Sequence, residues 1–108
     1  MNNRLSLYLK SLIDRVYKIL PLYEEQNEGL FTYIQSLIYE LNGFKWIRES
    51  GIVAEYYSLL ATLESLSDDA ICFSKENECV IKREVFKCIT IIKKIIVAYE
   101  SGDETELF

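Results

Sequence analysis

The sequence has no histidine among its 108 residues. Histidine is the usual side chain that titrates near neutral pH, and it is a frequent zinc ligand. Its absence excludes Ser-His and Cys-His catalysis and most zinc sites. The glycine-rich loop that cradles phosphates is also missing, since the chain has only four glycines and one proline. We therefore expect a protein that is not an enzyme and that carries no cofactor and no metal.

Cysteine is scarce, and the count of three is odd. Cys72 and Cys79 are seven residues apart, a wider spacing than the C-x2-C of zinc motifs, and Cys88 falls on an apolar stripe. No segment near the N-terminus has the features of a signal peptide. We expect reduced thiols, a buried Cys88 and a cytoplasmic protein.

Long apolar runs are absent as well. The longest nearly apolar stretch, 88–99, contains Lys93 and Lys94 and is too short to span a bilayer. The hydrophobic fraction of 50% and the charged fraction of 27% are those of a soluble globular protein. The sequence predicts one helical domain over residues 1–102, an acidic tail over 103–108, and no membrane partner.

Apolar residues recur at helical spacing in four segments of the chain. The predicted helices cover residues 3–20, 30–41, 52–66 and 78–99. For residues 22–28 and 70–78 the sequence does not decide between helix and loop, because their apolar residues show no clear helical spacing. Signals for strands are poor, since the one Asn-Gly pair closes a helical pattern instead of joining two alternating segments.

Four breaks set the expected helix ends. Pro21 ends or kinks the first helix, because proline cannot donate to the helical hydrogen bonds. Gly43 after Asn42 is a C-terminal signal, with the glycine expected in the left-handed conformation. The last helix is expected to begin near Ser74 or Asn77 as N-cap and to end at residues 101–102.

The first and last of these segments are basic, and the two between them are acidic. Residues 1–20 carry a net charge of +3, 22–44 carry −4, 51–69 carry −4 and 79–99 carry +4, within a total of −5. This pattern predicts a basic half and an acidic half. The expected fold is all-α, a compact antiparallel four-helix bundle or a closely related helical array.

The last predicted helix carries more apolar residues than one core-facing stripe requires. Its polar arc is narrow and basic and includes Lys87 and Lys94. Phe86 and Val97 lie beside the apolar arc, next to Lys93. Either this helix is central, or the surplus arc meets another chain, as a homodimer or a complex with a different protein.

Two further sets of residues are candidates for an interface. Trp46 lies between two glycines and is either a binding residue or a lid on the core. Glu55 and Glu64 mark the acidic half, and the net negative charge favours that half as the functional face.

Paired carboxylates give the alternative of an enzyme. Glu25 and Glu28 have the Glu-x-x-Glu spacing that helical NTP pyrophosphatases use to bind magnesium. The second pair of that pattern is missing, because Ser67 stands at the third position after Glu64. A carboxylate-dependent nucleotide phosphohydrolase therefore stays an alternative only.

The sequence favours a protein that acts by binding another protein, as an inhibitor, immunity or regulatory protein. Lysine outnumbers arginine 8 to 4, a bias typical of AT-rich bacterial or phage genomes. Binding of nucleic acid through the basic face of the last helix is a second alternative. It is disfavoured because the whole chain is acidic and the helix lacks side chains suited to reading bases.

Overall fold

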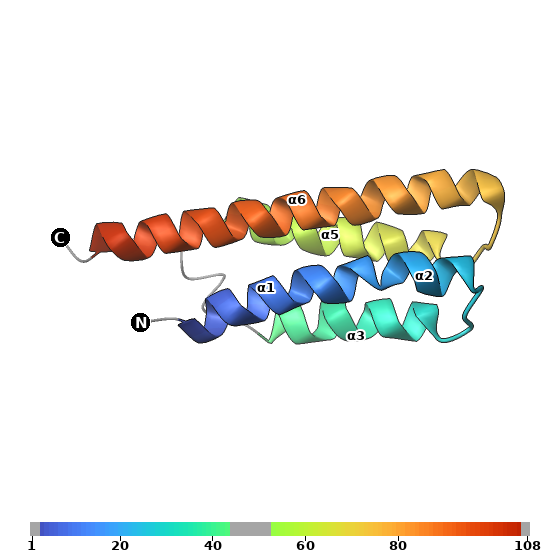
Figure 1. Cartoon of the computed structure of the whole chain (residues 1–108), viewed down its shortest axis with the longest axis horizontal. Coiled ribbons are helices and arrows are strands. Elements are labelled where there is room, and N and C mark those ends of the chain that lie inside the picture. Colours follow the sequence, from blue (N-terminus) through green and yellow to red (C-terminus); the bar gives the residue numbers. More distant parts are fainter. Residues whose placement is uncertain (1–2, 44–52, 107–108) are drawn as a thin grey trace.

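A computed structural model describes the backbone of residues 3–43 and 53–106 and the side chains of 6–43 and 54–98. Its helices are α1 (Asn3–Tyr17), α2 (Ile19–Glu24), α3 (Leu30–Asn42), α5 (Val53–Asp69) and α6 (Lys75–Glu106). Figure 1 shows that α1 and α2 follow one another along a single rod, and that successive rods run in opposite directions. The prediction of an all-α antiparallel bundle is confirmed.

The helices pack in a closed order around the core. Helix α6 contacts α1, α2 and α5, while α3 contacts α2 and α5. The long axis of the molecule is 51 Å, and the 32 residues of α6 alone extend about 48 Å. Its C-terminal end continues beyond the start of α1 (Figure 1). Within the described residues, every helix is too short or too polar to cross a membrane.

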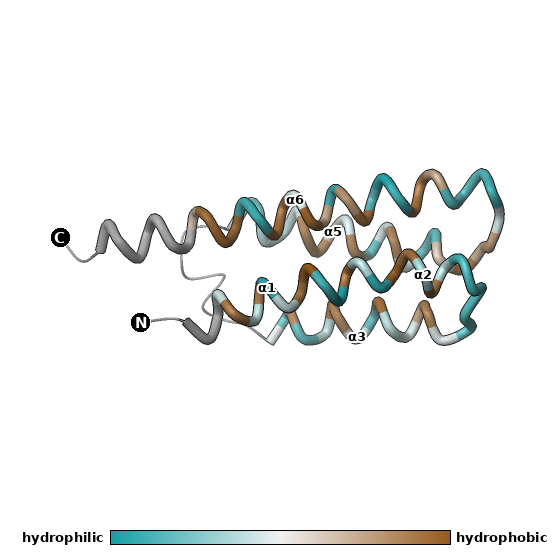
Figure 2. The backbone as a smooth tube through the Cα atoms, in the orientation of Figure 1, coloured by the Kyte–Doolittle hydropathy of each residue, from teal (hydrophilic) through white to brown (hydrophobic). Residues whose placement is uncertain are grey.

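The predicted apolar stripes form the core. Fully buried residues recur every three or four positions in each helix, and Figure 2 shows the resulting alternation of hydrophobic and hydrophilic residues along the rods. They include Leu9, Leu12, Val16, Ile19, Leu30, Ile34, Leu37, Leu41, Leu59, Leu63, Leu66, Ile81, Val85, Cys88, Ile92 and Ile95. The helical spacing of apolar residues in the sequence therefore predicted correctly which side chains form the core.

Pro21 interrupts the first rod without ending it. The proline has no N–H to donate to the carbonyl of Tyr17, and the helix is broken at Lys18, one residue later. Backbone hydrogen bonds continue across the break, from the N–H of Lys18 to the carbonyl of Asp14 and from the N–H of Leu22 to the carbonyl of Lys18. Of the two predicted outcomes at Pro21, an end is wrong and a local interruption is correct.

The open segment 22–28 divides into the end of α2 and a tight turn. Gln26 has a φ of 55°, in the left-handed region that glycine usually fills. Its N–H donates to the carbonyl of Tyr23, and the N–H of Asn27 donates to the carbonyl of Leu22. These two bonds form a Schellman cap, which glutamine rather than glycine closes, so the sequence gives no clear signal for it.

Two predicted helix ends differ from the structure. Gly43 does follow the end of α3, but its φ of −80° is right-handed, and its N–H donates to the carbonyl of Glu40. Helix α5 continues past the predicted end at Leu66 to Asp69, because Ser67 is buried and accepts a hydrogen bond of 2.6 Å from Gln35 of α3.

Helix α6 begins after one of its two predicted caps and ends beyond its predicted limit. Ser74 caps it, since its Oγ accepts a hydrogen bond of 3.1 Å from the N–H of Asn77. The predicted end at residues 101–102 is wrong, because the helix passes through Gly102 and ends at Glu106. The segment 70–74 is the connection between α5 and α6.

Candidate functional site

Two rows of residues run along α6 in steps of four and three. The inner row faces the core and consists of Ile81, Val85, Cys88, Ile92 and Ile95, all fully buried. We call the second row the outer seam; it consists of Cys79, Arg83, Phe86, Thr90, Lys93 and Val97, all exposed. Such spacing keeps residues in one line along a helix, and this line lies opposite the core. The outer seam extends about 27 Å.

The surplus apolar arc of α6 is mostly covered within the molecule. Ile89, Ile91 and Ile96 are buried, with at most 8% of each exposed. They are covered because α6 has α1 on one side and α5 on the other. Of the apolar residues beyond the core-facing stripe, Phe86 and Val97 remain on the surface, with 50% and 63% of their area exposed. The sequence-based expectation of a large uncovered arc was too broad, and the two residues that it singled out are on the surface.

The exposed surface of α6 is basic. Nine residues between positions 79 and 97 are exposed; five of them are lysine or arginine, and none is acidic. Lys87 and Lys94, two of the predicted interface residues, flank the outer seam. Among the side chains that the structure describes, no carboxylate lies within ion-pair distance of these five cations. Like charges four residues apart, as at Arg83 and Lys87, cost a helix about 0.2–0.5 kcal/mol.

Apolar surface from α1 adjoins the outer seam. The rings of Tyr17 and Phe86 meet edge to face with centroids 6.0 Å apart. Leu7, also on α1, is 65% exposed. Further along α6, Lys93 and Val97 line a shallow open hollow together with Thr90, Lys94 and Ala98. Lysine stems contribute apolar area to such a surface while their ammonium groups stay in water.

The opposite side of the bundle is formed by α3 and α5. Helices α3 and α5 contain no lysine and no arginine. Glu64 is exposed and Glu55 is half-buried on α5, so the predicted acidic half exists. The exposed large residues here are mostly aromatic, with Tyr39 at 83% and Tyr57 at 55%. Trp46, the remaining predicted candidate, lies outside the described residues.

An ion pair between α1 and α3 joins the basic and acidic sides. Arg15 binds Glu40 with both nitrogens, at 3.0 and 2.6 Å. The Arg15 hydrogen bonds hold the pKa of Glu40 below its usual value. The Tyr8 hydroxyl donates to the same carboxylate, and burial, followed by the charge of Glu40, raises the pKa of Tyr8 to about 12. This pair links α1 to α3 and involves none of the exposed cations of α6.

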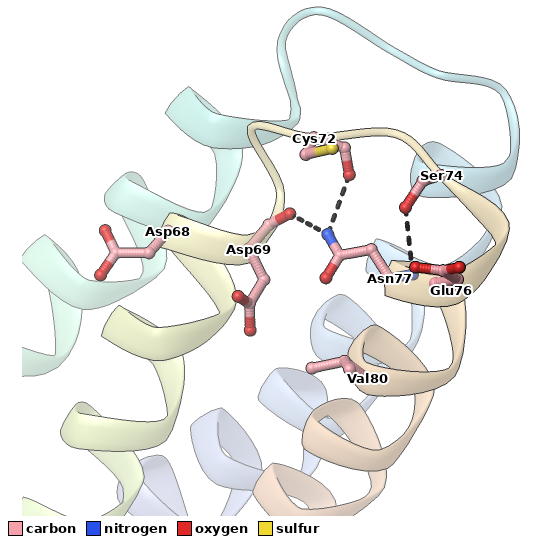
Figure 3. Close-up of a pocket in the computed structure, with 7 residues that line it drawn as sticks. All are labelled: Asp68, Asp69, Cys72, Ser74, Glu76, Asn77 and Val80. Atoms are coloured by element: carbon pink, nitrogen blue, oxygen red, sulfur yellow. Dashed lines mark hydrogen bonds between the residues drawn. The ribbon is translucent and has the colours of Figure 1, made fainter.

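A pocket at the α5–α6 connection is drawn in Figure 3. Its polar atoms hold the chain in place: the Asn77 amide donates to the carbonyls of Asp69 and Cys72, and its N–H donates to Ser74. The Asp68 side chain points away from the other acidic groups (Figure 3). Because the Ser74 hydroxyl, the Asn77 amide and the carbonyls of Asp69 and Cys72 are hydrogen-bonded within the turn, we interpret the pocket as a structural feature of the connection.

Tyr23 fastens the same turn from α2. Its hydroxyl donates to the carbonyl of Cys72 at 2.6 Å and accepts from the N–H of Ser74 at 3.1 Å. Its ring packs on Phe73, with centroids 5.2 Å apart. These contacts join residues about fifty positions apart, and nothing in the local pattern of the chain predicts them.

A polar groove between α5 and α6 contains Glu84. One carboxylate oxygen of Glu84 accepts a short hydrogen bond from Ser65, and the other is buried without a partner in the described residues. Burial, and next a hydrogen bond with Asp69, raise the pKa of Glu84 above its usual value. Arg83 and Lys87 line the groove beside it.

The thiols and carboxylates show no catalytic grouping in the described part of the chain. Cys88 is buried, as predicted, and burial raises its pKa to about 12, which keeps it protonated. Cys72 and Cys79 are exposed. Within the residues described, no three cysteine, aspartate or glutamate side chains lie close enough to hold a metal ion. Glu25 and Glu28 lie in the turn between α2 and α3, both exposed.

Comparison of the chain with models of protein families, with curated proteins and with solved structures gives no match. We therefore infer the function from the exposed surface of α6.

Proposed function

We propose that this protein acts by binding another protein, and that the outer seam of α6 is the contact surface. The observation that carries the proposal is the composition of the seam: exposed Phe86 and Val97 alternate with cations that have no carboxylate within ion-pair distance among the described side chains. Aromatic and arginine side chains are the usual anchors of protein interfaces.

The charge of the whole chain supports this choice of surface. A molecule with a net charge of −5 concentrates five cations on one helix face. Exposed cations attract a partner of opposite sign and determine its orientation. The net charge alone favours the acidic side, but the acidic side lacks this concentration of one charge around apolar residues. The free thiols favour a reducing, cytoplasmic setting.

The proposal places the chain among inhibitor, immunity or regulatory proteins that occlude a surface of their partner. Catalysis is the less favoured alternative, because Glu25 and Glu28 lie in an exposed turn.

Affinity capture with matched variants tests the proposal. The tagged protein is compared with Phe86→Ala/Val97→Ala on the outer seam and with Tyr39→Ala/Tyr57→Ala on the opposite side, in extracts of the organism that encodes the chain. Circular dichroism verifies that all three are folded. We expect one protein that the unaltered chain and the tyrosine variant recover equally, and that the seam variant recovers about tenfold less.

Loss of the captured protein in the tyrosine variant alone would move the function to the acidic side. Recovery of no protein by the unaltered chain would contradict binding as the function.

A further inference from the structure

We infer that the partner presents an acidic amphipathic helix, which packs lengthwise along the outer seam of α6. This inference rests on the proposed function and adds the chemistry and the shape of the partner. It follows from three properties of the seam: its straightness, its alternation of apolar and basic residues, and the sign of its flanking charges.

The straightness of the seam suits a helix. Its members are separated by steps of 4, 3, 4, 3 and 4 residues, the spacing by which one helix packs against another along a common line. The length of about 27 Å matches a partner helix of about 18 residues. A loop or a strand would use a pocket or a sheet edge, and the described part of the chain has no strand.

The alternation of side chains determines the residues that the partner needs. Phe86 and Val97 would pack against apolar residues of the partner helix. Arg83 and Lys93 would pair with its carboxylates. Lys87 and Lys94 lie beside the seam, where the charged residues of paired helices meet. Tyr17 of α1 widens the apolar part next to Phe86. A helix with leucine on one stripe and glutamate beside it satisfies all of these positions.

Charge argues against a second copy of this chain as the occupant. A two-fold dimer uses the same patch on both molecules. Pairing two outer seams would bring Arg83 and Lys93 of each seam, and the exposed lysines that flank them, close to the same cations of the other copy. Like charges placed opposite each other in an interface repel and weaken the association. The seam therefore fits an acidic helix of another protein better than its own copy.

Nucleic acid is the other polyanion that a basic face attracts. Of the six seam residues, Phe86, Val97 and Cys79 are apolar, and Thr90 is the one uncharged polar residue. Contacts to phosphates use cations and polar groups, and exposed apolar residues in line gain nothing from them. The apolar half of the seam therefore favours a protein helix.

A designed peptide tests the inference without knowledge of the partner. The probe is a helix of about 20 residues with leucine on one stripe and glutamate beside it. A shuffled peptide of identical composition is the first control. Fluorescence anisotropy of the labelled peptides with the full chain measures affinity at low and physiological salt. We expect the helical probe to bind at least about tenfold tighter than the shuffled peptide, with affinity that falls as salt rises.

Matched variants localise the binding. Arg83→Gln/Lys93→Gln removes two positive charges from the seam, and Thr32→Glu/Ser36→Glu gives the chain the same net charge by changing the exposed face of α3. We expect the first variant to lose about tenfold in affinity for the probe and the second to lose less than about threefold. Equal losses would show attraction by net charge alone and overturn the inference.

Three further results would overturn it. These are equal binding of the shuffled peptide, tighter binding of duplex DNA than of the probe, and a dimer of the free chain that Phe86→Ala disperses. If the probe fails while affinity capture still yields a seam-dependent protein, the proposed function stands and only the acidic helix is wrong.

Discussion

The side of the bundle formed by α1 and α6 and the side formed by α3 and α5 have equally regular cores and opposite surfaces. Each helix buries a row of apolar residues at 0% exposure. Yet α3 and α5 contain no lysine or arginine, whereas five of the nine exposed residues of α6 between positions 79 and 97 are basic and none is acidic. The core therefore does not require the cations. This difference is the reason why we propose the α6 surface, and not the acidic side, as a binding surface.

The largest expected effect separates the two rows of α6. Ile92→Ala removes buried atoms from the inner row and should lower the free energy of unfolding by about 2–5 kcal/mol. Val97→Ala in the outer seam should change it by less than about 0.5 kcal/mol, because an exposed side chain leaves no cavity. Urea denaturation measures both. Similar losses for the two variants would mean that the outer seam is part of the core.

The next effect compares two neighbouring tyrosines on the acidic side. The Tyr56 hydroxyl is buried and donates to the carbonyl of Leu41 at 3.0 Å, whereas Tyr57 is exposed. Tyr56→Phe should cost about 1 kcal/mol, the net value of a hydrogen bond. Tyr57→Phe should cost nothing measurable in the same thermal unfolding experiment. A loss in Tyr57→Phe would show that this surface contributes to folding.

A third prediction concerns Glu40, which forms the ion pair between α1 and α3 with Arg15. Because Arg15 lowers the pKa of Glu40, the pair stabilises the fold above the ordinary glutamate pKa, and the benefit is lost as the pH falls through the lowered value. Glu40→Gln should cost at most about 1 kcal/mol near neutral pH, since both side chains are partly exposed. The cost should vanish in acid. Denaturation at both pH values measures this, and an equal cost at each would contradict the charge argument.

Glu84 should show the opposite dependence on pH. Its pKa is raised, so the native state favours the protonated form, and stability is lost as the pH rises through the raised value. Glu84→Gln should keep the hydrogen bond with Ser65 and unfold at a higher temperature near neutral pH. The gain should be less than about 1 kcal/mol, because the side chain is partly exposed. Below the ordinary glutamate pKa the difference should disappear; a gain that persists there would rule out ionisation as its cause.

The smallest expected effect concerns the repulsion between neighbouring cations of α6, which lowers the stability of the unbound protein. Arg83→Glu replaces a like-charge pair with Lys87 by an opposite-charge pair four residues apart. It should raise the free energy of unfolding by about 0.5 kcal/mol and weaken partner binding. If Arg83→Glu gains stability but binds the partner as tightly as before, the positive charge of Arg83 is not needed for binding.

The sequence predicted the fold class and the buried rows because both depend on local spacing. Leu9 and Ile92, for example, follow from the helical period alone. The helix ends were harder, since Gln26 takes a left-handed conformation that glycine usually signals, and Ser67 is kept in α5 by Gln35 of a different helix. Long-range contacts determine such boundaries, and a single sequence does not show them.

The candidate surface was predicted in part. The sequence singled out Phe86, Lys93 and Val97 on the last helix, and the structure places all three on the surface. It did not reveal Tyr17, which meets Phe86 from α1, or the burial of Ile91 by neighbouring helices. These details depend on which helices flank α6. The 4-3 spacing of the outer seam, however, is readable in the sequence once the core row is known.

The central claim is that the outer seam of α6 contacts a protein partner, and photo-crosslinking in the encoding organism tests it most directly. A photoreactive phenylalanine analogue is introduced at Val97 on the seam or at Tyr39 on the opposite side, both highly exposed. Illuminated cells are analysed by mass spectrometry. The account predicts a covalent adduct with one acidic protein from position 97 and none from position 39. Adducts from position 39 alone, or from neither position, would contradict it.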